Sequence, residues 1–328
     1  MLGHMNDALI YRLDHLSVVE VSGADASTIL HNLTTNEVRG LVDGEGRETF
    51  ITDVRGKTLG HVCLFKHQDG LRLVGPTGQS EVICSHIDRY TIREDATAGI
   101  QDSEFVGFVI APELAALCGW GGDAQMALRS FACDTEFNGV TLYEVRWLGH
   151  NTILFCLPVA KAEHALEILS SLVPSRAGIQ SADLMQQQVG NEAAFHQARL
   201  VEGFPWYGVD LDDSNLPQEA DRDSETISFT KGCYLGQETV ARLDAMGQVQ
   251  KKLVRWSIEG GVPLAGTSLS ADEKKVARLT SVASTEEHGV LAMGFARRSH
   301  FEPGACAFGV IESETGEDSE AAITGTVI

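Results

Sequence analysis

The hydrophobic pattern of this chain changes near Gly247, and that change restricts the fold more than any other feature of the sequence. Before Gly247, segments with helical spacing of apolar residues alternate with strand-like segments. After it, strand-like segments are separated by Gly, Pro and acidic turns, and they span residues 248–258, 275–283, 290–297, 305–311 and 321–328. Short strands without intervening helices are typical of a small antiparallel β-barrel. The sequence therefore predicts an α+β body followed by a C-terminal barrel of about five or six strands.

The expected α+β body shows the order strand, strand, helix twice. Its first part should hold a helix capped by Asp25 and ending before Gly40, with strands and a helix over residues 48–52, 58–66, 71–74 and 81–93. Its second part should hold strands and helices over residues 105–110, 140–148, 152–157, 160–172 and 182–197, with a short helix after Pro112. We therefore expect three parts, over residues 6–100, 101–246 and 247–328.

Charge and cysteine usage exclude several classes of protein. The chain has 46 acidic and 25 basic side chains, and its formal net charge of -21 repels nucleic acid and anionic lipid. Seven cysteines occur without a C-x-x-C pair, and the histidines form no H-x-x-x-H pair, so neither a disulfide framework nor a permanent metal is expected. Without a long apolar run or a leader pattern, the expected location is the cytoplasm.

The charge is distributed unevenly along the chain. Residues 231–300 carry ten Lys/Arg and seven Asp/Glu, whereas the preceding segment 210–225 is rich in acids. A basic segment in an acidic protein is suited to an anionic small molecule, but mixed charge is also ordinary at protein surfaces. The acidic segment 210–225 and the acidic tail after Phe301 are either solvated loops or a docking face for basic partners. Composition leaves these alternatives open.

One cysteine stands in an unusual local sequence. Cys233 lies between two nearby glycines, two positions after Lys231, at the expected start of a helix over residues 235–243. A cation and a helix N-terminus both stabilise a thiolate, which would make Cys233 the reactive thiol of the chain. The alternative is a small buried cysteine in a turn, because free cysteines are frequently buried.

The same segment carries a family resemblance. The octapeptide Lys231-Gly232-Cys233-Tyr234-Leu235-Gly236-Gln237-Glu238 resembles the K-G-C-Y-x-G-Q-E signature of the YgfZ family, the folate-binding relatives of the aminomethyltransferase of glycine cleavage. Further segments match the same family or superfamily, namely Gly23–Ala26, Asp53 with Gly56-Lys57, Arg199–Pro205, Gly208 with Asp210, Pro217–Ala220 and Met293–Arg298. The resemblance thus covers nearly the whole chain.

The resemblance implies a ring-like molecule in which a two-part α+β body of mixed and antiparallel sheets and a β-barrel surround a channel for tetrahydrofolate or a one-carbon derivative. Glu202 stands at the position that reads the pterin, and a carboxylate can accept two adjacent N–H bonds from a pterin edge. The alternative for Glu202 is an ion pair with Arg199 at helical spacing. The implied site residues are Cys233 and Lys231 for chemistry, and Arg199, Glu202, Tyr234, Gln237, Glu238 and Arg242 for the cofactor.

The resemblance also implies a function, the assembly or repair of iron–sulfur clusters in client enzymes, with an indirect effect on tRNA modification. The implied partners are folate and iron–sulfur client or assembly proteins, without direct binding to nucleic acid or membrane. The alternative is a tetrahydrofolate-dependent aminomethyltransferase or one-carbon transferase, for which Asp53 is the nearest candidate carboxylate. Strand 71–74 runs into Gly75-Pro76-Thr77-Gly78 without the Asn-Ala step and aspartate of that enzyme, so whether the chain is an enzyme stays open.

Overall fold

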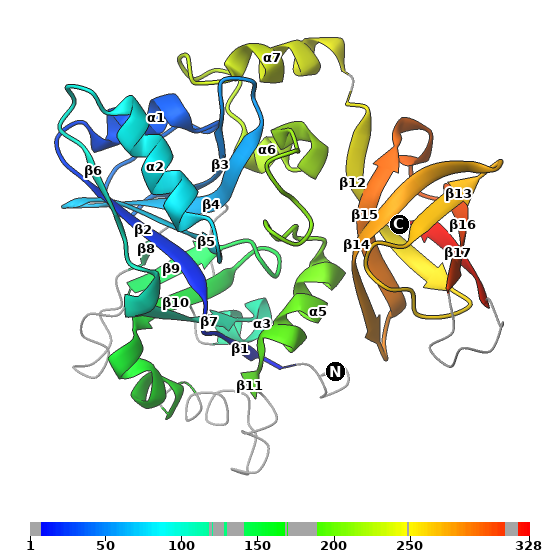
Figure 1. The fold of residues 1–328 in the computed structure, drawn as a ribbon. Coiled ribbons are helices and arrows are strands. Elements are labelled where there is room, and N and C mark those ends of the chain that lie inside the picture. Colours follow the sequence, from blue (N-terminus) through cyan, green and yellow to red (C-terminus); the bar gives the residue numbers. More distant parts are fainter. Residues whose placement is uncertain are drawn as a thin grey trace.

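The computed structural model describes residues 8–117, 120, 128–129, 141–167, 169, 189–247, 249–311 and 321–328. In this part of the chain, two sheets form the α+β body and a closed barrel stands beside them (Figure 1). The predicted fold class, an α+β body with a C-terminal antiparallel barrel, is confirmed. Among the described residues, no helix is both long and apolar enough to cross a membrane.

The first sheet has the strand order β3-β4-β5-β2-β6 and is antiparallel throughout. Its strands are β2 (Leu16–Ser22), β3 (Gly46–Thr52), β4 (Thr58–His67), β5 (Gly70–Pro76) and β6 (Thr97–Ile100). Helices α1 (Ala26–Leu33) and α2 (Ser80–Tyr90) pack on one face, where their apolar residues share a core with those of the strands. The predicted helices and hairpin of this part are confirmed, but the Asp25 carboxylate accepts a bond from Asp95 N instead of capping α1.

The second sheet has the order β11-β1-β7-β10-β9-β8 and is mixed, because β1 pairs with β11 in parallel and with β7 antiparallel. Its strands are β1 (Ile10–Leu13), β7 (Phe105–Ile110), β8 (Leu128–Arg129), β9 (Thr141–Val145), β10 (Thr152–Pro158) and β11 (Val189–Gly190). Short helical segments around it are η1 (Asp102–Glu104), α3 (Pro112–Leu117) and η2 (Val159–Lys161). The two sheets share a buried core to which the first contributes Phe65 and Val74 and the second Val109 and Tyr143.

Helix α5 (Glu192–Glu202) connects this sheet to the functional region. The helix expected over 182–197 is shifted: residues 182–188 lie outside the described part, residues 189–190 form β11, and the helix continues five positions beyond Gln197. Asn191 caps its start, where the side chain accepts a bond from Ala194 N at 3.0 Å. The helix expected over 160–172 falls partly outside the described residues.

The barrel closes in the order β12-β15-β14-β13-β16-β17. Its strands are β12 (Lys251–Glu259), β13 (Ser268–Ala271), β14 (Lys274–Thr285), β15 (Gly289–Arg297), β16 (Cys306–Ile311) and β17 (Ala321–Val327), with η5 (Arg298–His300) after β15. The five predicted strands are present, and β13 is the strand that the sequence pattern missed. Trp256, Leu279 and Ile323 lie in the barrel core, while Phe295 packs against a body cluster formed by Phe50, Leu211 and Ala220.

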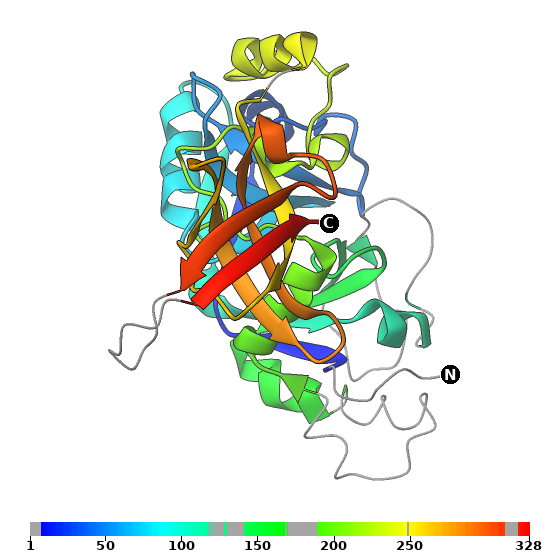
Figure 2. The same cartoon turned by 90° about the vertical axis from the view of Figure 1, so that its right-hand side faces the viewer.

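The segment between α5 and the barrel holds η4 (Pro217–Ala220), α6 (Asp223–Thr226) and α7 (Gln237–Met246). Figures 1 and 2 both show α7 at the end of the molecule next to the first sheet and away from the second. This segment therefore runs from the body–barrel junction, where α5 ends, to the outer end of the first sheet.

Candidate functional site

A polar cleft of about 390 Å³ lies between the α+β body and the barrel. The body contributes the end of α5 and residues 220–222, and the barrel contributes β12 and the segment after η5. Its charged lining residues are Glu202, Asp221, Arg222, Lys252, Arg255 and Glu302. The cleft therefore combines carboxylates and cations from two separate parts of the fold.

Glu202 presents an exposed carboxylate to this cleft from the last residue of α5. The side chain lies against Gly149, where an added Cβ would stand 2.9 Å from Glu202 Oε2. Gly149 has φ +85° and Gly203, the C-cap of α5, has φ +77°, so both positions favour glycine on conformational grounds as well. Within the described residues no ion pair engages Glu202, and the alternative of a pair with Arg199 is wrong.

Arg199 is buried instead, with 1% exposure, and does not line the cleft. Its Nη1 donates to Asp210 Oδ2 at 2.6 Å and its Nη2 donates to Ser281 Oγ at 3.0 Å. Thr280 Oγ1 and Ser281 Oγ each donate to Asp210 Oδ1 at 2.6 Å. Consecutive strand residues normally point to opposite faces, but the register of β14 shifts between Leu279 and Ser281, and both hydroxyls reach one carboxylate. Arg199 and Asp210 thus join α5 to the barrel.

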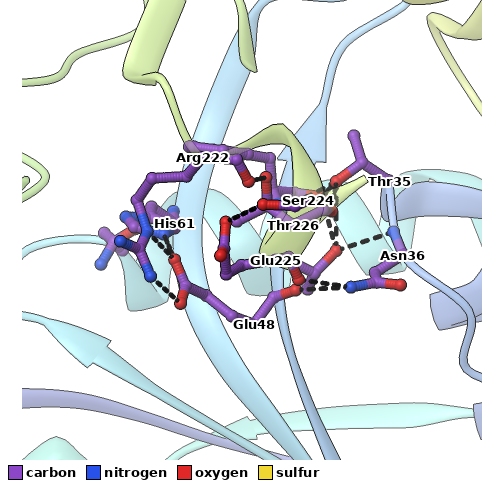
Figure 3. A network of polar contacts seen from close by, with 11 residues as sticks. Thr35, Asn36, Glu48, His61, Arg222, Ser224, Glu225 and Thr226 are labelled. Carbon is purple, nitrogen blue, oxygen red and sulfur yellow. Dashed lines mark hydrogen bonds and ion pairs between the residues drawn. The ribbon is translucent and has the colours of Figure 1, made fainter. Parts of the chain in front are cut away.

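A second ion pair, between buried Glu48 and partly exposed Arg222, supports the body side of the cleft (Figure 3). Arg222 donates Nε to Glu48 Oε1 at 2.5 Å and Nη2 to Glu48 Oε2 at 2.6 Å, and its guanidinium lies 4.7 Å from the ring centroid of Phe204. His61 Nε2 lies 2.8 Å from Glu48 Oε1. Burial opposes ionisation of Glu48, but Arg222 and His61 hold its pKa well below the usual range.

Sequence reasoning missed this pair. Glu48 and Arg222 are 174 positions apart, and the available signal was the single arginine within the acid-rich segment 210–225. Nothing in the spacing pointed from Arg222 to a buried glutamate on β3.

The segment after α1 anchors the loop that carries Arg222 (Figure 3). Thr35 Oγ1 donates to Thr226 O at 2.7 Å, and Asn36 Nδ2 donates to Glu225 O at 2.8 Å and to Glu48 O at 2.9 Å. These are side-chain bonds to backbone carbonyls, so they fix the path of the chain as well as one rotamer. The Arg222 side of the cleft is therefore held to the first sheet.

Lys231 of the octapeptide is held by the same segment. It is 8% exposed, and its Nζ donates to His31 O at 2.6 Å, Thr34 O at 2.7 Å and Asn36 O at 2.7 Å. Tyr234 lies beside it, with 4.9 Å between Nζ and the ring centroid. Burial lowers the pKa of Lys231 to about 7, although the charge of Glu37 opposes that shift.

Cys233 is exposed and lines a second pocket, of about 320 Å³, together with Ile29, Asn32, Leu33, Tyr90, Glu94, Tyr234 and Leu235. The alternative of a buried cysteine in a turn is therefore wrong. Helix α7 begins at Gln237 instead of the expected Leu235, four positions after the thiol. The intervening Gly236 has φ +81°, and an added Cβ would stand 2.5 Å from Asp53 O. A side chain is excluded there because the hairpin turn of the first sheet packs directly on the octapeptide.

The remaining predicted site residues lie around this second pocket or on α7. Gln237 Oε1 accepts a bond from Tyr234 N at 3.4 Å, while Glu238 and Arg242 are exposed on α7 and line neither pocket. In the described part of the chain, Arg242 forms no ion pair. The predicted cofactor residues therefore lie at separate places, with Glu202 in the cleft and Tyr234 beside Cys233.

Asp53, the candidate carboxylate for one-carbon transfer, accepts hydrogen bonds within its own hairpin turn. Its Oδ1 accepts bonds from Arg55 N and Lys57 N, both at 2.8 Å. Burial opposes ionisation of Asp53, but the backbone bond from Lys57 and the bonds from Arg55 lower its pKa. An ionised aspartate with these bonds stabilises the hairpin turn.

Comparisons with known proteins agree with the octapeptide. No family model matches the chain. It is 24% identical to the tRNA-modifying protein YgfZ of Vibrio vulnificus, over 78% of this chain and 73% of that protein. It is 26% identical to the mitochondrial iron–sulfur cluster assembly factor IBA57 of Mus musculus, over 80% of this chain and 69% of that protein.

A solved structure shares the fold. Aminomethyltransferase T of the glycine cleavage system from Bartonella henselae superposes with a TM-score of 0.76 at 17% identity, covering 98% of this chain and 86% of that one. The octapeptide Lys231–Glu238 and these relatives show that the chain is similar to YgfZ proteins, and its fold is that of aminomethyltransferase T.

Proposed function

We propose that this protein binds tetrahydrofolate or a one-carbon derivative in the body–barrel cleft and supports iron–sulfur cluster assembly or repair in client enzymes, in the cytoplasm. The observation that carries the proposal is the Glu202 carboxylate, exposed in the cleft and without an ion pair among the described residues. A pterin presents adjacent N–H donors that such a carboxylate can accept. The names of the relatives, an iron–sulfur assembly factor and a tRNA-modifying protein, support the client side of the proposal.

The other cleft residues are suited to the rest of a folate. Lys252 and Arg255 stand on β12 of the barrel, opposite the end of α5, and cations there favour the carboxylates of a glutamate tail. Lys252 Nζ lies 3.1 Å from Asp221 Oδ1, in a partly exposed pair that a ligand carboxylate can compete for. When bound, the folate supplies the one-carbon chemistry, while Glu202 orients the pterin.

Cys233 is the functional thiol in this proposal. It lies in a pocket separate from the cleft, exposed to solvent and accessible to a partner protein. Client proteins of the iron–sulfur class would therefore meet the thiol at the outer end of the first sheet, and folate would bind at the barrel.

Replacing Glu202 tests the folate site. We expect Glu202→Ala to weaken tetrahydrofolate binding by about 1.5–3 kcal/mol, because charge-assisted bonds to the pterin are lost. Isothermal titration calorimetry measures the change. The matched control is Glu302→Ala, since Glu302 is an exposed carboxylate of the same cleft. An unchanged dissociation constant in Glu202→Ala would place the pterin elsewhere.

Replacing Cys233 tests the thiol. We expect Cys233→Ser to keep folding and folate affinity but to lose rescue of iron–sulfur enzyme activity in a strain lacking the protein. Cys306→Ser is the control, because Cys306 is an exposed cysteine on the barrel, and it should rescue fully. Full rescue by Cys233→Ser would refute a functional thiol.

The competing function is tetrahydrofolate-dependent aminomethyl transfer, which the shared fold with aminomethyltransferase T favours. Asp53 is the candidate carboxylate, and its turn bonds leave this function without a placed general acid or base among the residues we predicted. Formation of methylenetetrahydrofolate from an aminomethyl-carrying lipoyl protein would favour this function over cluster assembly.

A further inference from the structure

The ammonium group of Lys231 is fully engaged by backbone carbonyls. A protonated lysine has three N–H donors and no acceptor, and Lys231 directs its donors to three carbonyl oxygens at 2.6–2.7 Å. Those carbonyls belong to His31, Thr34 and Asn36, at the C-terminal end of α1 and in the segment that follows it. Carbonyls at a helix C-terminus carry a partial negative charge and attract a cation.

We infer that Lys231 is a positioning residue, which clamps the loop bearing Cys233 onto the end of α1 and does not act on the thiol directly. The inference rests on the proposed function in one respect, that Cys233 is the working thiol. The expectation that Lys231 activates Cys233 as a neighbouring charge is replaced by a mechanical role, in which the cation sets where the thiol stands.

The other attachments of the loop lie on both sides of the thiol. Before it, Ser228 N donates to Thr35 O at 3.0 Å. After it, Leu235 N donates to Asn32 O at 2.8 Å, and Leu235 O accepts a bond from Thr52 Oγ1 at 2.7 Å. Lys231 supplies three further bonds between these two points, so it holds the stretch of loop that lies between the two backbone attachments.

The charged groups around the clamp fit this role. Glu37 and Arg39 follow the segment that receives Lys231, and their charges act on the ammonium in opposite directions. His31 is buried next to them, and burial together with the charge of Lys231 lowers its pKa, so the neutral ring is favoured. The ammonium is therefore held mainly by the three carbonyls and not by a carboxylate partner.

The clamp also shares its anchor with the cleft. Thr35 and Asn36 hold residues 225–226, which follow Arg222 of the cleft wall, and Asn36 O accepts from Lys231. One short segment after α1 thus fixes both the folate side and the thiol side of the molecule.

Lys231→Met tests the clamp, with two readouts on purified protein without folate or client. Amide hydrogen exchange of residues 228–236, measured near pH 6 so that Lys231 is mainly protonated, should rise roughly tenfold or more, because the loop loses three charge-assisted bonds. The midpoint of the pH profile for alkylation of Cys233 by iodoacetamide, measured in a Cys306→Ser background, should stay within about 0.2 pH units, because the cation does not act on the thiol. Exposed Lys275→Met is the control and should change neither readout.

A second variant separates charge from geometry and serves if Lys231→Met does not fold. Lys231→Arg keeps the positive charge, but a planar guanidinium cannot direct donors to the three converging carbonyls, so loop exchange should again rise. Exchange at the unmutated rate in both variants overturns the inference. A rise of about one pH unit in the alkylation midpoint of Lys231→Met also overturns it, since the cation would then stabilise the thiolate. Neither readout uses rescue, so failure of Cys233 in the strain test remains separate.

Discussion

Two charged side chains near the candidate sites find their partners far away in the sequence. Arg222 pairs with Glu48, and Lys231 reaches carbonyls about 200 positions earlier in the chain. The sequence could single out Lys231 and Cys233, because an eight-residue pattern is visible locally. It could not predict that Lys231 donates to backbone carbonyls, because every residue has such a carbonyl and the sequence does not mark which ones accept. Glu202 was identified from the family pattern. Arg199 does not pair with Glu202, because Arg199 binds Asp210, eleven positions beyond it in the sequence.

Asp223 gives a prediction at the residue scale. Burial, followed by the charges of Asp221 and Asp244, raises its pKa to about 6, and its Oδ1 has no hydrogen-bond partner in the described part of the chain. Between about pH 4 and pH 6 the folded protein therefore binds more protons than the unfolded chain, whose aspartates titrate near pH 3.9. The stability contribution of this group is present at low pH and is lost as the pH rises through about 6.

We expect Asp223→Asn to be more stable than the original protein by about 1–2 kcal/mol at pH 7, after allowing for partial exposure, and equally stable near pH 4. Urea unfolding at both pH values measures this difference. Asp69→Asn, at an exposed aspartate, is the control and should change the free energy of unfolding by no more than about 0.5 kcal/mol. Equal stabilities of Asp223→Asn and the original protein at pH 7 would mean that Asp223 ionises without cost.

At the scale of elements, the periodicity of apolar residues predicted helices and strands that depend on neighbouring residues in the sequence. Helical spacing located α1 and α2, and strand-like runs located most of the barrel, because burial of one face imposes these periods on the sequence. The pattern missed β13, a Ser-Leu-Ser-Ala strand with one fully buried apolar residue, Leu269. It also placed the start of α7 two residues early, because the packing of Gly236 on Asp53 decides that boundary and is a tertiary contact.

The shift in β14 shows the same limit. No local signal marks Thr280 and Ser281 as neighbours of one buried carboxylate. The register shift in β14 lets both hydroxyls reach Asp210, which belongs to the body and is far away in the sequence. Bulges of this kind re-aim side chains and are set by what the strand must contact. Strand positions could thus be predicted from the sequence, but which residues of β14 face the body could not.

At the scale of the whole molecule, the net charge of -21 gives no sign that acids of the body contact cations of the barrel. The acid-rich segment 210–225 is not solvated throughout, because Asp210 and Glu219 are buried in it and Asp210 bonds to the barrel. Lys251 and Lys252 of β12 lie 3.4 Å and 3.1 Å from Glu219 and Asp221. Acids of the body thus meet cations of the barrel beside the cleft.

Asp210 is the centre of this junction, and its replacement should weaken the whole molecule. Asp210→Asn leaves the buried guanidinium of Arg199 without a counter-charge, and breaking a buried pair in this manner costs about 3–5 kcal/mol. Urea unfolding measures the loss, and exposed Asp213→Asn is the control. The Arg199→Met/Asp210→Asn double variant should recover part of the stability, because the uncompensated charge is gone. Tetrahydrofolate affinity should fall in Asp210→Asn as well, since the same contacts hold the barrel wall of the cleft against α5. Unchanged stability of Asp210→Asn would show that apolar packing, such as that of Phe295 against the cluster of Phe50, Leu211 and Ala220, suffices to hold the barrel in place.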